Sequence, residues 1–574
     1  MPITDTYIEK DAAINEEIER LRHATTQSLL TRKDVIIVAS VSCIYGLGSP
    51  EDYEREHLKI LKGEKVNRNT LLRKLVGVFY ERTTADLTPG TFRALGNTVE
   101  IMPTSERIVY SIDLDGDTVS RIQEVDAVSR VLLKEHESIF IFPAKHFITT
   151  KEDRARAIKS IRAELEVLLK RFNAEGKLLE AERIERRTVQ DLAMIEEVGF
   201  CSGIENYSRH LSGRPEGEAP DTLLAYFPHK VDGTPDFLTV IDESHVTLPQ
   251  LAGMFGGDRS RKETLVEYGF RLPSAKDNRP LQYEEFEERI GQVIYTSATP
   301  SEVEKKASAQ IVEQIIRPTG LLDPEVEVRP IKDDGAYRGQ IVDVISEIEK
   351  IVAKGDRALV TTLTKKMAED LAQYLKEKKI KAEYLHSDVK TIDRITLISN
   401  FRRGQFDCLV GVNLLREGLD LPEVSFIGIL DADKEGFLRS ETSLVQTIGR
   451  AARNAAGRVI LYADNITGSM KRAMDETSRR RKTQDEYNKA HGITPKTIKK
   501  AIHDIASELE ARRTRIAVAN VKLEEELTHE DVGKLIRKKE KQMNSAAKVL
   551  DFESAAILRD EIKVLKKKLH QTLG

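Results

Sequence analysis

Two adjacent carboxylates, Asp242 and Glu243, come directly after the apolar run at residues 238–241. Such a run is typical of a buried parallel strand, and ligands bind these sheets at the carboxyl ends of the strands. In a nucleotide-hydrolysing motor the first carboxylate holds Mg²⁺ through water, and the second polarises the attacking water. His245 completes the tetrapeptide Asp-Glu-Ser-His. We therefore predict a catalytic, Mg²⁺-binding loop; the plainer alternative is a polar turn that closes a strand.

Small hydroxyl residues follow the next predicted strand, in the sequence Thr-Ser-Ala-Thr-Pro at 296–300. We expect these hydroxyls to bond the carboxylate loop and relay its state, with Thr299 as a candidate nucleotide contact. Alone, this run would be interpreted as an ordinary turn. Its place one strand after the carboxylates favours the functional interpretation.

A glutamine and two arginines, Gln446, Arg450 and Arg453, recur at spacings of four and three residues. A helix presents residues at these spacings on one face. Arginines in this arrangement can act as catalytic fingers on a transferring phosphoryl group. The alternative is a solvated basic face. The small residues between them weaken that alternative because they predict close packing: Gly449, Ala451 and Ala452.

Two further loops follow predicted strands. Thr362 belongs to the run Thr-Thr-Leu-Thr, and hydroxyls at such a place commonly contact a nucleic-acid backbone. A turn with a helix cap is the alternative for that run. Four residues follow the predicted strand at 407–412: Asn413, Glu417, Gly418 and Asp420. We expect them to contact the ribose of a nucleotide and to connect that contact to the arginines.

Alternating strands and helices must place these loops at the edges of sheets. Strand-like runs begin near Ala358, Ala382, Asp407, Val424 and Arg458, with helical stretches between them. This alternation predicts an α/β fold with a parallel sheet covered on both faces. The apolar runs at 35–39, 237–241 and 293–295 predict further strands, and the first is expected to be buried on both faces.

The remaining segments have other patterns. Residues 14–31 and 152–198 have the periodicity of amphipathic helices, the second as one long stretch. Short alternating segments with turn signals predict a mostly β insertion at 49–142. The Lys-rich tail at 531–569 predicts two antiparallel helices that turn near Asp551.

Composition limits the function classes. A chain of 574 residues predicts several domains, and a net charge of −4 means that any DNA contact must come from local basic faces. The longest apolar runs, of about five to seven residues, are far short of a membrane span. No secretory signal pattern precedes the first helix. The scattered cysteines Cys43, Cys201 and Cys408 argue for the cytoplasm and against a zinc or disulfide framework.

The five motifs, in this order and at these strand ends, resemble superfamily 2 helicases. More specific strings resemble the UvrB family, the damage-verifying subunits of a bacterial excinuclease, and the resemblance covers essentially the whole chain. These strings lie at 5–11, 39–48, 201–208, 262–273 and 430–440. Residues 546–560 resemble the helical-hairpin module that this family shares with UvrC.

The resemblance implies a mechanism. UvrA delivers the subunit to damaged double-stranded DNA, a β-hairpin inserts between the strands, and ATP turnover with Mg²⁺ tests whether a base flips freely. UvrC then binds and cuts. A homodimer on DNA is a further partner that the resemblance allows, and no membrane is involved.

The resemblance also assigns contact residues. It places Tyr7 and Lys10 on the returning hairpin strand and, with Tyr207 and Arg209, against DNA. In the insertion it assigns UvrA docking to Arg82 and Arg93, although Leu95 stands where another arginine is usual. In the tail it assigns UvrC docking to Phe552.

One family feature is missing. The phosphate-binding loop G-x-x-x-x-G-K-[ST] does not occur, since Gly176-Lys177 and Gly533-Lys534 are each followed by leucine. Residues 1–11 match the family partway into its hairpin, so we expect the chain to be a piece of a longer protein. The alternatives are a scaffold that docks UvrA and UvrC without turning over ATP, and a processive helicase.

With this resemblance the expected domains can be stated. Two RecA-like lobes are expected, the first incomplete. The expected boundaries are 1–48 for the hairpin and start of the first lobe, 49–142 for the UvrA-docking β insertion, 143–318 for a helical DNA-facing region and the rest of the first lobe, 319–500 for the second lobe, 501–530 for a linker and 531–574 for the helical hairpin.

Overall fold

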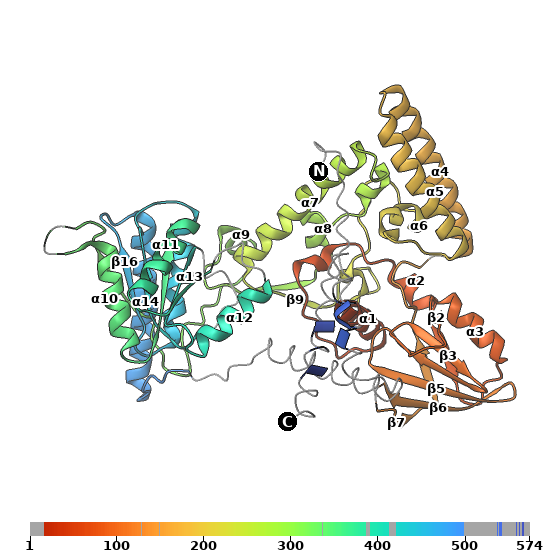
Figure 1. Ribbon diagram of the computed structural model, residues 1–574, viewed down its shortest axis with the longest axis horizontal. Helices are drawn as coiled ribbons and strands as arrows, with labels where there is room; N and C mark the ends of the chain where they lie inside the picture. Colours follow the sequence, from red (N-terminus) through yellow and green to blue (C-terminus); the bar gives the residue numbers. More distant parts are fainter. Residues whose placement is uncertain are drawn as a thin grey trace. The chain divides into compact units, whose positions relative to one another are not determined.

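The computed structural model describes residues 16–127, 129–148, 150–333, 335, 337–385, 391–412 and 421–498, with scattered residues between 536 and 566. The chain divides into two compact units, one ending at Ala307 and one beginning at Ser308 (Figure 1). Each unit has its own parallel sheet and is described by itself. No helix among the described residues is long and apolar enough to cross a bilayer.

The first described element of the first unit is the predicted helix α1 (Glu16–Thr31), and the mostly β insertion is confirmed. Two short helices, α2 (Pro50–Arg55) and α3 (Arg68–Gly77), accompany its strands. A closing antiparallel pair joins β1 (Leu58–Leu61) to β8 (Ser138–Ile141). The main sheet has the order β2-β3-β4-β5-β6-β7, with these bounds: β2 Glu81–Arg82, β3 Thr91–Leu95, β4 Thr98–Met102, β5 Ile108–Asp115, β6 Thr118–Asp126 and β7 Leu132–Glu135.

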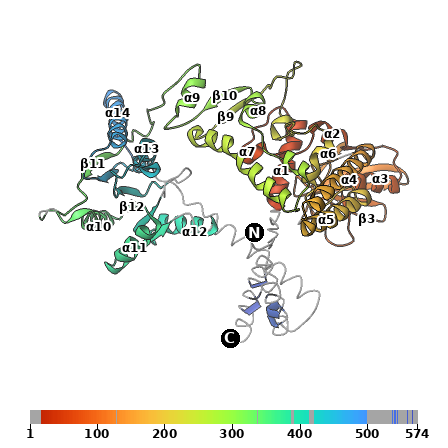
Figure 2. The ribbon, with the colours of Figure 1, turned by 90° about the horizontal axis from the view of Figure 1, so that it is seen from above.

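A helical hairpin follows the insertion. The sequence predicts one long helical stretch, but the structure has two helices packed side by side, α4 (Lys151–Ala174) and α5 (Leu178–Glu197) (Figures 1 and 2). Gly176 breaks the stretch because its φ of +73° lies in the left-handed region that glycine enters without strain. The short helix α6 (Ser208–Ser212) packs on α4.

The parallel sheet of the first unit has two strands among the described residues, β9 (Leu238–Ile241) and β10 (Gln292–Tyr295). Both were predicted. The short helices α8 (Tyr283–Glu288) and α9 (Glu302–Ala307) flank β10 in sequence. The longer helix α7 (Ser244–Glu267) starts directly after the adjacent carboxylates.

The far end of α7 is fixed to the helical hairpin. Arg183 Nη1 of α5 donates a hydrogen bond of 2.6 Å to the carbonyl of Tyr268. Gly269, with φ +67°, lies so close to α5 that a Cβ there would stand 2.3 Å from the carbonyl oxygen of Glu180. At the other end the Ser244 N–H donates a hydrogen bond of 3.1 Å to the carbonyl of Thr296, so both ends of α7 are held.

The prediction of a strand at 35–39 is wrong. The segment has no strand pairing, and the side chains of Ile36 and Val38 are 91% and 96% exposed. Val35 and Ile37 point the other way and pack on an apolar cluster with Tyr226 and Phe142. An apolar run becomes a buried strand only where a neighbouring strand satisfies its backbone, and no described residue pairs with this run.

The second unit is a six-stranded parallel sheet in the order β11-β16-β15-β12-β14-β13. Five strands were predicted: β12 Arg357–Thr362, β13 Ala382–Leu385, β14 Cys408–Val412, β15 Val424–Ile429 and β16 Arg458–Tyr462. The sixth, β11 (Glu325–Arg329), was missed because its alternating Glu and Val residues do not form an apolar run.

Helices cover this sheet on both faces, as predicted. One buried cluster joins the sheet to α13 (Glu441–Ile448) and α14 (Gly468–His491), and another joins it to α10 (Gly339–Val352) and α11 (Lys365–Glu377). The remaining helix is α12 (Thr391–Arg402).

The described residues of the C-terminal tail are helical, as predicted. Ile536, Ile562 and Leu565 are buried there. Lys566 Nζ lies 2.7 Å from the carboxylate of Glu540, which joins the two ends of the tail. The predicted turn near Asp551 lies outside the described residues.

Candidate active site and contact surfaces

The adjacent carboxylates lie at the carboxyl end of β9. Asp242 is exposed, and Glu243 has φ 45° and ψ 50°, immediately before α7 begins. A left-handed conformation costs a non-glycine residue about 1–3 kcal/mol, and such residues cluster at functional sites. Here the conformation lies at the junction between β9 and α7, and both carboxylates are at the carboxyl end of the strand.

Hydroxyl groups from the loop after β10 bond this carboxylate loop, as predicted. Thr296 Oγ1 donates a hydrogen bond of 2.8 Å to Asp242 Oδ1, and Ser297 Oγ lies 2.7 Å from His245 Nδ1. The sheet register explains the match, because Ile241 pairs with Tyr295 and the next residues of both strands therefore meet. The two loops form one hydrogen-bonded network.

Glu304 of α9 also belongs to this network, and sequence reasoning missed it. Its side chain is buried and accepts 2.9 Å from Ser244 Oγ and 3.0 Å from the backbone N–H of Ser301. Burial alone would raise the pKa of Glu304, but these hydrogen bonds outweigh it and the net shift is downward. The spacing Ser301-x-x-Glu304 at a helix start was the available signal.

The residues at β9 fit a hydrated Mg²⁺ ion and an attacking water. Asp242 accepts the Thr296 bond through one oxygen and is open to solvent. Glu243 Oε2 is buried without a hydrogen-bond partner, although His245 Nδ1 lies 3.6 Å away. A buried carboxylate oxygen without a donor is costly unless a further ligand completes it.

The predicted arginine group lies in the second unit. Gln446 is on α13, but the α-helix ends at Ile448, and Arg450 and Arg453 lie on the 3₁₀ helix η7 (Gly449–Arg453). The predicted helix is therefore an α-helix at Gln446 and a 3₁₀ helix at the two arginines. A spacing of three residues is one full turn of a 3₁₀ helix, so the two arginines share a side. All three side chains are half-buried.

The small residues of this turn behave differently from one another. Ala451 and Ala452 are buried, which confirms the predicted close packing. Gly449 is exposed, and a Cβ there would meet nothing within 4 Å, so the prediction is wrong for the glycine.

The hydroxyl run after β12 is largely internal. Thr364 accepts a 3.1 Å hydrogen bond from the Met367 N–H and caps α11, as the alternative interpretation expected. Thr362 is buried and donates 3.1 Å to the carbonyl of Thr364. Thr299 is half-buried, and its N–H donates to Ser297 Oγ at 3.0 Å. The DNA contact of Thr362 and the nucleotide contact of Thr299 stay predictions.

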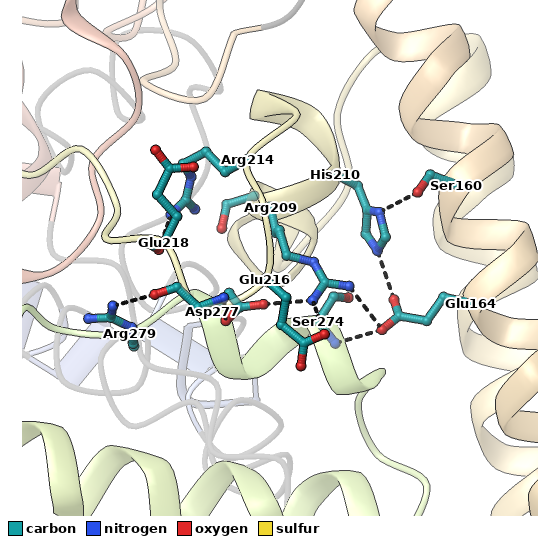
Figure 3. Close-up of polar contacts among 12 residues, drawn as sticks. Ser160, Glu164, Arg209, His210, Arg214, Glu216, Glu218, Ser274, Asp277 and Arg279 are labelled. Atoms are coloured by element: carbon teal, nitrogen blue, oxygen red, sulfur yellow. Dashed lines mark hydrogen bonds and ion pairs between the residues drawn. The ribbon is translucent and has the colours of Figure 1, made fainter.

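Tyr207 and Arg209 make contacts inside the first unit. Tyr207 is buried, and its hydroxyl donates 2.7 Å to Asp191. Arg209 lies between Asp277 at 2.8 Å and Glu164 at 3.5 Å (Figure 3).

His210 extends this network. Its ring lies 2.8 Å from Ser160 Oγ and 2.7 Å from Glu164 (Figure 3). Burial raises the pKa of Glu164, but its hydrogen bonds to His210 and Ser274 lower it overall. The network joins α4, α6 and the 3₁₀ helix η5 (Pro273–Asp277) within the first unit. These contacts are structural and do not test DNA binding, so the DNA role of Tyr207 and Arg209 stays a prediction.

The predicted UvrA-docking arginines differ in exposure. Arg82 is exposed on β2. Arg93 on β3 pairs across the sheet with Glu100, which also binds Arg130 at 2.6 Å. Leu95 is 58% exposed on the same strand. Seven other predicted contact residues lie outside the described residues: Tyr7, Lys10, Asn413, Glu417, Gly418, Asp420 and Phe552.

Comparisons with known proteins cover the whole chain. Family models match in five places: the UvrB interaction domain at 58–147, the UvrB third helical domain at 152–213, the helicase conserved C-terminal domain at 341–455, ultra-violet resistance protein B at 461–503 and the UvrB/uvrC motif at 533–568.

Curated relatives agree with these matches. The UvrABC system protein B of Caldanaerobacter subterraneus subsp. tengcongensis is 56% identical over 100% of this chain and 84% of its own length. Those of Geobacillus kaustophilus and Bacillus caldotenax are each 57% identical over 99% of this chain and 84% of their own length. This chain belongs to the UvrB family.

Proposed function

We propose that the chain works as the B subunit of a UvrABC excinuclease in nucleotide excision repair. In this role it receives damaged DNA from UvrA, verifies the lesion with a helicase-type motor and recruits UvrC for incision. The observation that carries the proposal is the bonded pair of loops at β9 and β10. A motor needs its hydrolytic carboxylates connected to a neighbouring loop, and the Thr296–Asp242 and Ser297–His245 bonds supply that connection.

The motor residues have separate tasks in this proposal. Asp242 holds the water shell of Mg²⁺, Glu243 accepts a proton from the attacking water, and His245 with Ser297 reports their state to β10. When bound, Mg²⁺ neutralises the phosphate charge. Arg450 and Arg453 stabilise the charge that develops on the transferred phosphoryl group. The loop at 413–420, whose placement is outside the described residues, reads the ribose.

Two surfaces hold the protein partners. The segment at 58–147, which matches the UvrB interaction domain, docks UvrA through a surface that includes the exposed Arg82. The segment at 533–568, which matches the UvrB/uvrC motif, docks UvrC and includes Phe552. DNA lies against the hairpin residues Tyr7 and Lys10. The site of action is the cytoplasm.

A second function is favoured by one specific observation, namely that the chain contains no G-x-x-x-x-G-K-[ST] loop. A scaffold that docks UvrA and UvrC without ATP turnover would need only the two partner surfaces. Nucleotide binding separates the candidates, because a scaffold has no measurable affinity for a fluorescent ATP analogue.

UvrA binding tests what both candidates share. We expect the chain to bind immobilised UvrA, and Arg82→Glu to weaken that binding by about tenfold, the effect of losing about 1.4 kcal/mol. Arg121→Glu is the matched control, since Arg121 is an exposed arginine of the same insertion that pairs with Asp113 on its own sheet. Absence of UvrA binding by the unaltered chain would contradict the proposal.

A further inference from the structure

A serine, a histidine and a glutamate form one hydrogen-bonded row where α6 packs on the helical hairpin. Ser160 Oγ lies 2.8 Å from His210 Nδ1, and His210 Nε2 lies 2.7 Å from Glu164 Oε2 (Figure 3). Ser160 and Glu164 are four residues apart on α4, so the helix presents both on the face that meets α6. A nucleophile in hydrogen-bond reach of a base that a third group orients is the arrangement of a catalytic triad.

The glutamate determines which atoms of the row carry the protons. Burial alone would raise the pKa of Glu164, but its hydrogen bonds to His210 and Ser274 lower it overall, so at neutral pH it is a carboxylate that only accepts. A neutral His210 must then carry its proton on Nε2, which leaves a lone pair on Nδ1. The Ser160 hydroxyl therefore donates to Nδ1. This is the direction in which a general base takes a proton from a nucleophile.

Packing of α6 on α4 accounts for this hydrogen bond only in part. His210 is 9% exposed and Glu164 is half-buried, whereas Ser160 is exposed. Because water can replace the partner of an exposed hydroxyl, the bond to Ser160 adds little to the stability of the helix contact. The base is thus largely shielded from water, while the hydroxyl that it would activate is accessible to a substrate.

A cavity of about 360 Å³ is lined by Ser160, His210 and an arginine of the same helix, Arg156. Its volume suits a small molecule. Arg156 precedes Ser160 by four residues on α4, so both lie on one face of the helix. Its Nη1 lies 2.6 Å from Asp153, and its Nη2 would stand 2.8 Å from a Cβ at Gly213, which lines the same cavity. The guanidinium is therefore placed to stabilise an oxyanion that forms beside the serine.

The charge of the cavity selects the kind of substrate. Its lining contains three arginines and one glutamate, Glu216, whose side chain is 83% exposed. Arg214 donates 2.9 Å to Ser212 Oγ and 2.9 Å to the carbonyl of Glu218, and it forms no ion pair among the described residues. Both of its partners are neutral, so its positive charge is available to a ligand. A substrate with a negative charge suits this cavity.

We propose that Ser160 is the nucleophile of an ester-hydrolysing site and that His210, oriented by Glu164, is its general base. The substrate is a small carboxylic ester that carries a negative charge. The Ser160 oxygen attacks the carbonyl carbon while its proton passes to His210 Nδ1, and Arg156 stabilises the oxyanion. The alcohol then leaves with that proton, and the acyl group stays on Ser160.

Water completes the cycle. It attacks the acyl group and gives a proton to His210, the acid is released, and the Ser160 oxygen takes up the proton again. This activity goes beyond the proposed function and does not depend on it.

A fluorophosphonate probe, which modifies activated serines, tests the nucleophile in the full chain. Mass spectrometry of tryptic peptides should find the phosphonyl group on Ser160, and Ser160→Ala should remove it. His210→Gln should slow the labelling by at least about 100-fold, the lower end of the effect of a general base. Ser260→Ala is the matched control, because Ser260 is an exposed serine of α7 whose hydroxyl bonds no histidine among the described residues. It should be labelled as the unaltered chain is.

Two chromogenic esters test the substrate class. The chain should hydrolyse the anionic 3-acetoxy-4-nitrobenzoate with a lower KM than the neutral 2-nitrophenyl acetate, and Arg214→Gln should raise the first KM by about tenfold and leave the second unchanged. Equal KM values in the unaltered chain would refute the anionic substrate.

Two results would overturn the site itself. One is an unaltered chain that is not labelled at Ser160 and that hydrolyses neither ester faster than Ser160→Ala does. The other is equal labelling of the unaltered chain and of His210→Gln, with circular dichroism showing that the variant is folded.

Discussion

Lowering the pH should destabilise the junction between α1 and the β insertion before it destabilises the second unit. Two buried histidines meet there: His23 of α1 and His146 of the segment after β8 stack with ring centroids 4.0 Å apart. His23 Nδ1 lies 3.0 Å from the hydroxyl of Tyr53 on α2, and His146 Nε2 lies 3.2 Å from Thr26 Oγ1. Both ends of the insertion are thus attached to α1 through neutral imidazoles.

The magnitude follows from the pKa of His23. Burial, helped by the positive charge of Arg22, lowers this pKa from 6.5 to about 3. Burial also places the pKa of His146 well below its ordinary value. A base with a depressed folded-state pKa is neutral in both states above its unfolded pKa and costs no stability there, but the fold loses stability as the pH falls from 6.5 towards about 3, because only the unfolded state takes up the proton. At a pH of about 5 the loss from His23 alone is about 2 kcal/mol, and His146 adds to it in the same direction.

Hydrogen exchange measured by mass spectrometry at a pH of about 7.5 and about 5, corrected for the intrinsic exchange rate, checks this expectation. Peptides from α1 should lose about 2 kcal/mol or more of opening free energy, while peptides from α10, which contains no histidine, serve as the internal reference. His23→Gln should reduce the pH dependence of α1. Parallel changes in α1 and α10, or an unchanged pH dependence in His23→Gln, would refute the reasoning.

Four other outcomes are expected. Phosphate release separates the two proposed functions: the chain, whose sequence contains no G-x-x-x-x-G-K-[ST] loop to hold a triphosphate in line, should show no DNA-stimulated release if it is the scaffold, whereas release that Glu243→Gln abolishes would identify the motor. Amides of β9 and β10 should exchange faster than those of β12 and β15, because β9 and β10 pair only with each other among the described residues, whereas β12 and β15 are central in a sheet of six strands; equal protection would argue against it. Gly269→Ala should lower the free energy of unfolding by at least about 2 kcal/mol in urea titrations, since the new Cβ meets the Glu180 carbonyl, whereas Gly233→Ala, with a similar φ and open space, should lose only about 1 kcal/mol. Deleting 531–574 should abolish UvrC-dependent incision and leave UvrA binding unchanged; persistent incision would exclude the docking role of the tail.

The accuracy of the sequence predictions depended on how completely each strand is buried. Strands β12, β14 and β15 are covered on both faces, so their sequences are continuous apolar runs that are easy to recognise. The edge strand β11 alternates glutamate and valine and was missed. The run at 35–39 has the same apolar character as a central strand but pairs with no strand in the described part of the chain, and the need for a pairing strand is not visible in a local window.

The candidate-site residues that directly follow a predicted strand could be identified from the sequence. Asp242, Thr296 and Ser297 each follow an apolar run, and pairing of the two strands brings them together. Glu304 was missed because its role depends on a tertiary contact with Ser244, which lies sixty positions earlier in the chain. The change from α-helix to 3₁₀ helix before Arg450 was also hidden, since a spacing of three suits both helices.

The two fixed ends of α7 make its length a constraint of its own. A helix of 24 residues spans about 36 Å, and each residue turns the chain by about 100°. Inserting or deleting one residue between the carboxylate loop and Gly269 would rotate the far end away from Glu180 and Arg183 by that angle. Substitutions on the exposed side of α7 are then tolerable, whereas single-residue changes in its length are not. The length of α7 therefore sets the distance and the orientation between the carboxylate loop and the helical hairpin.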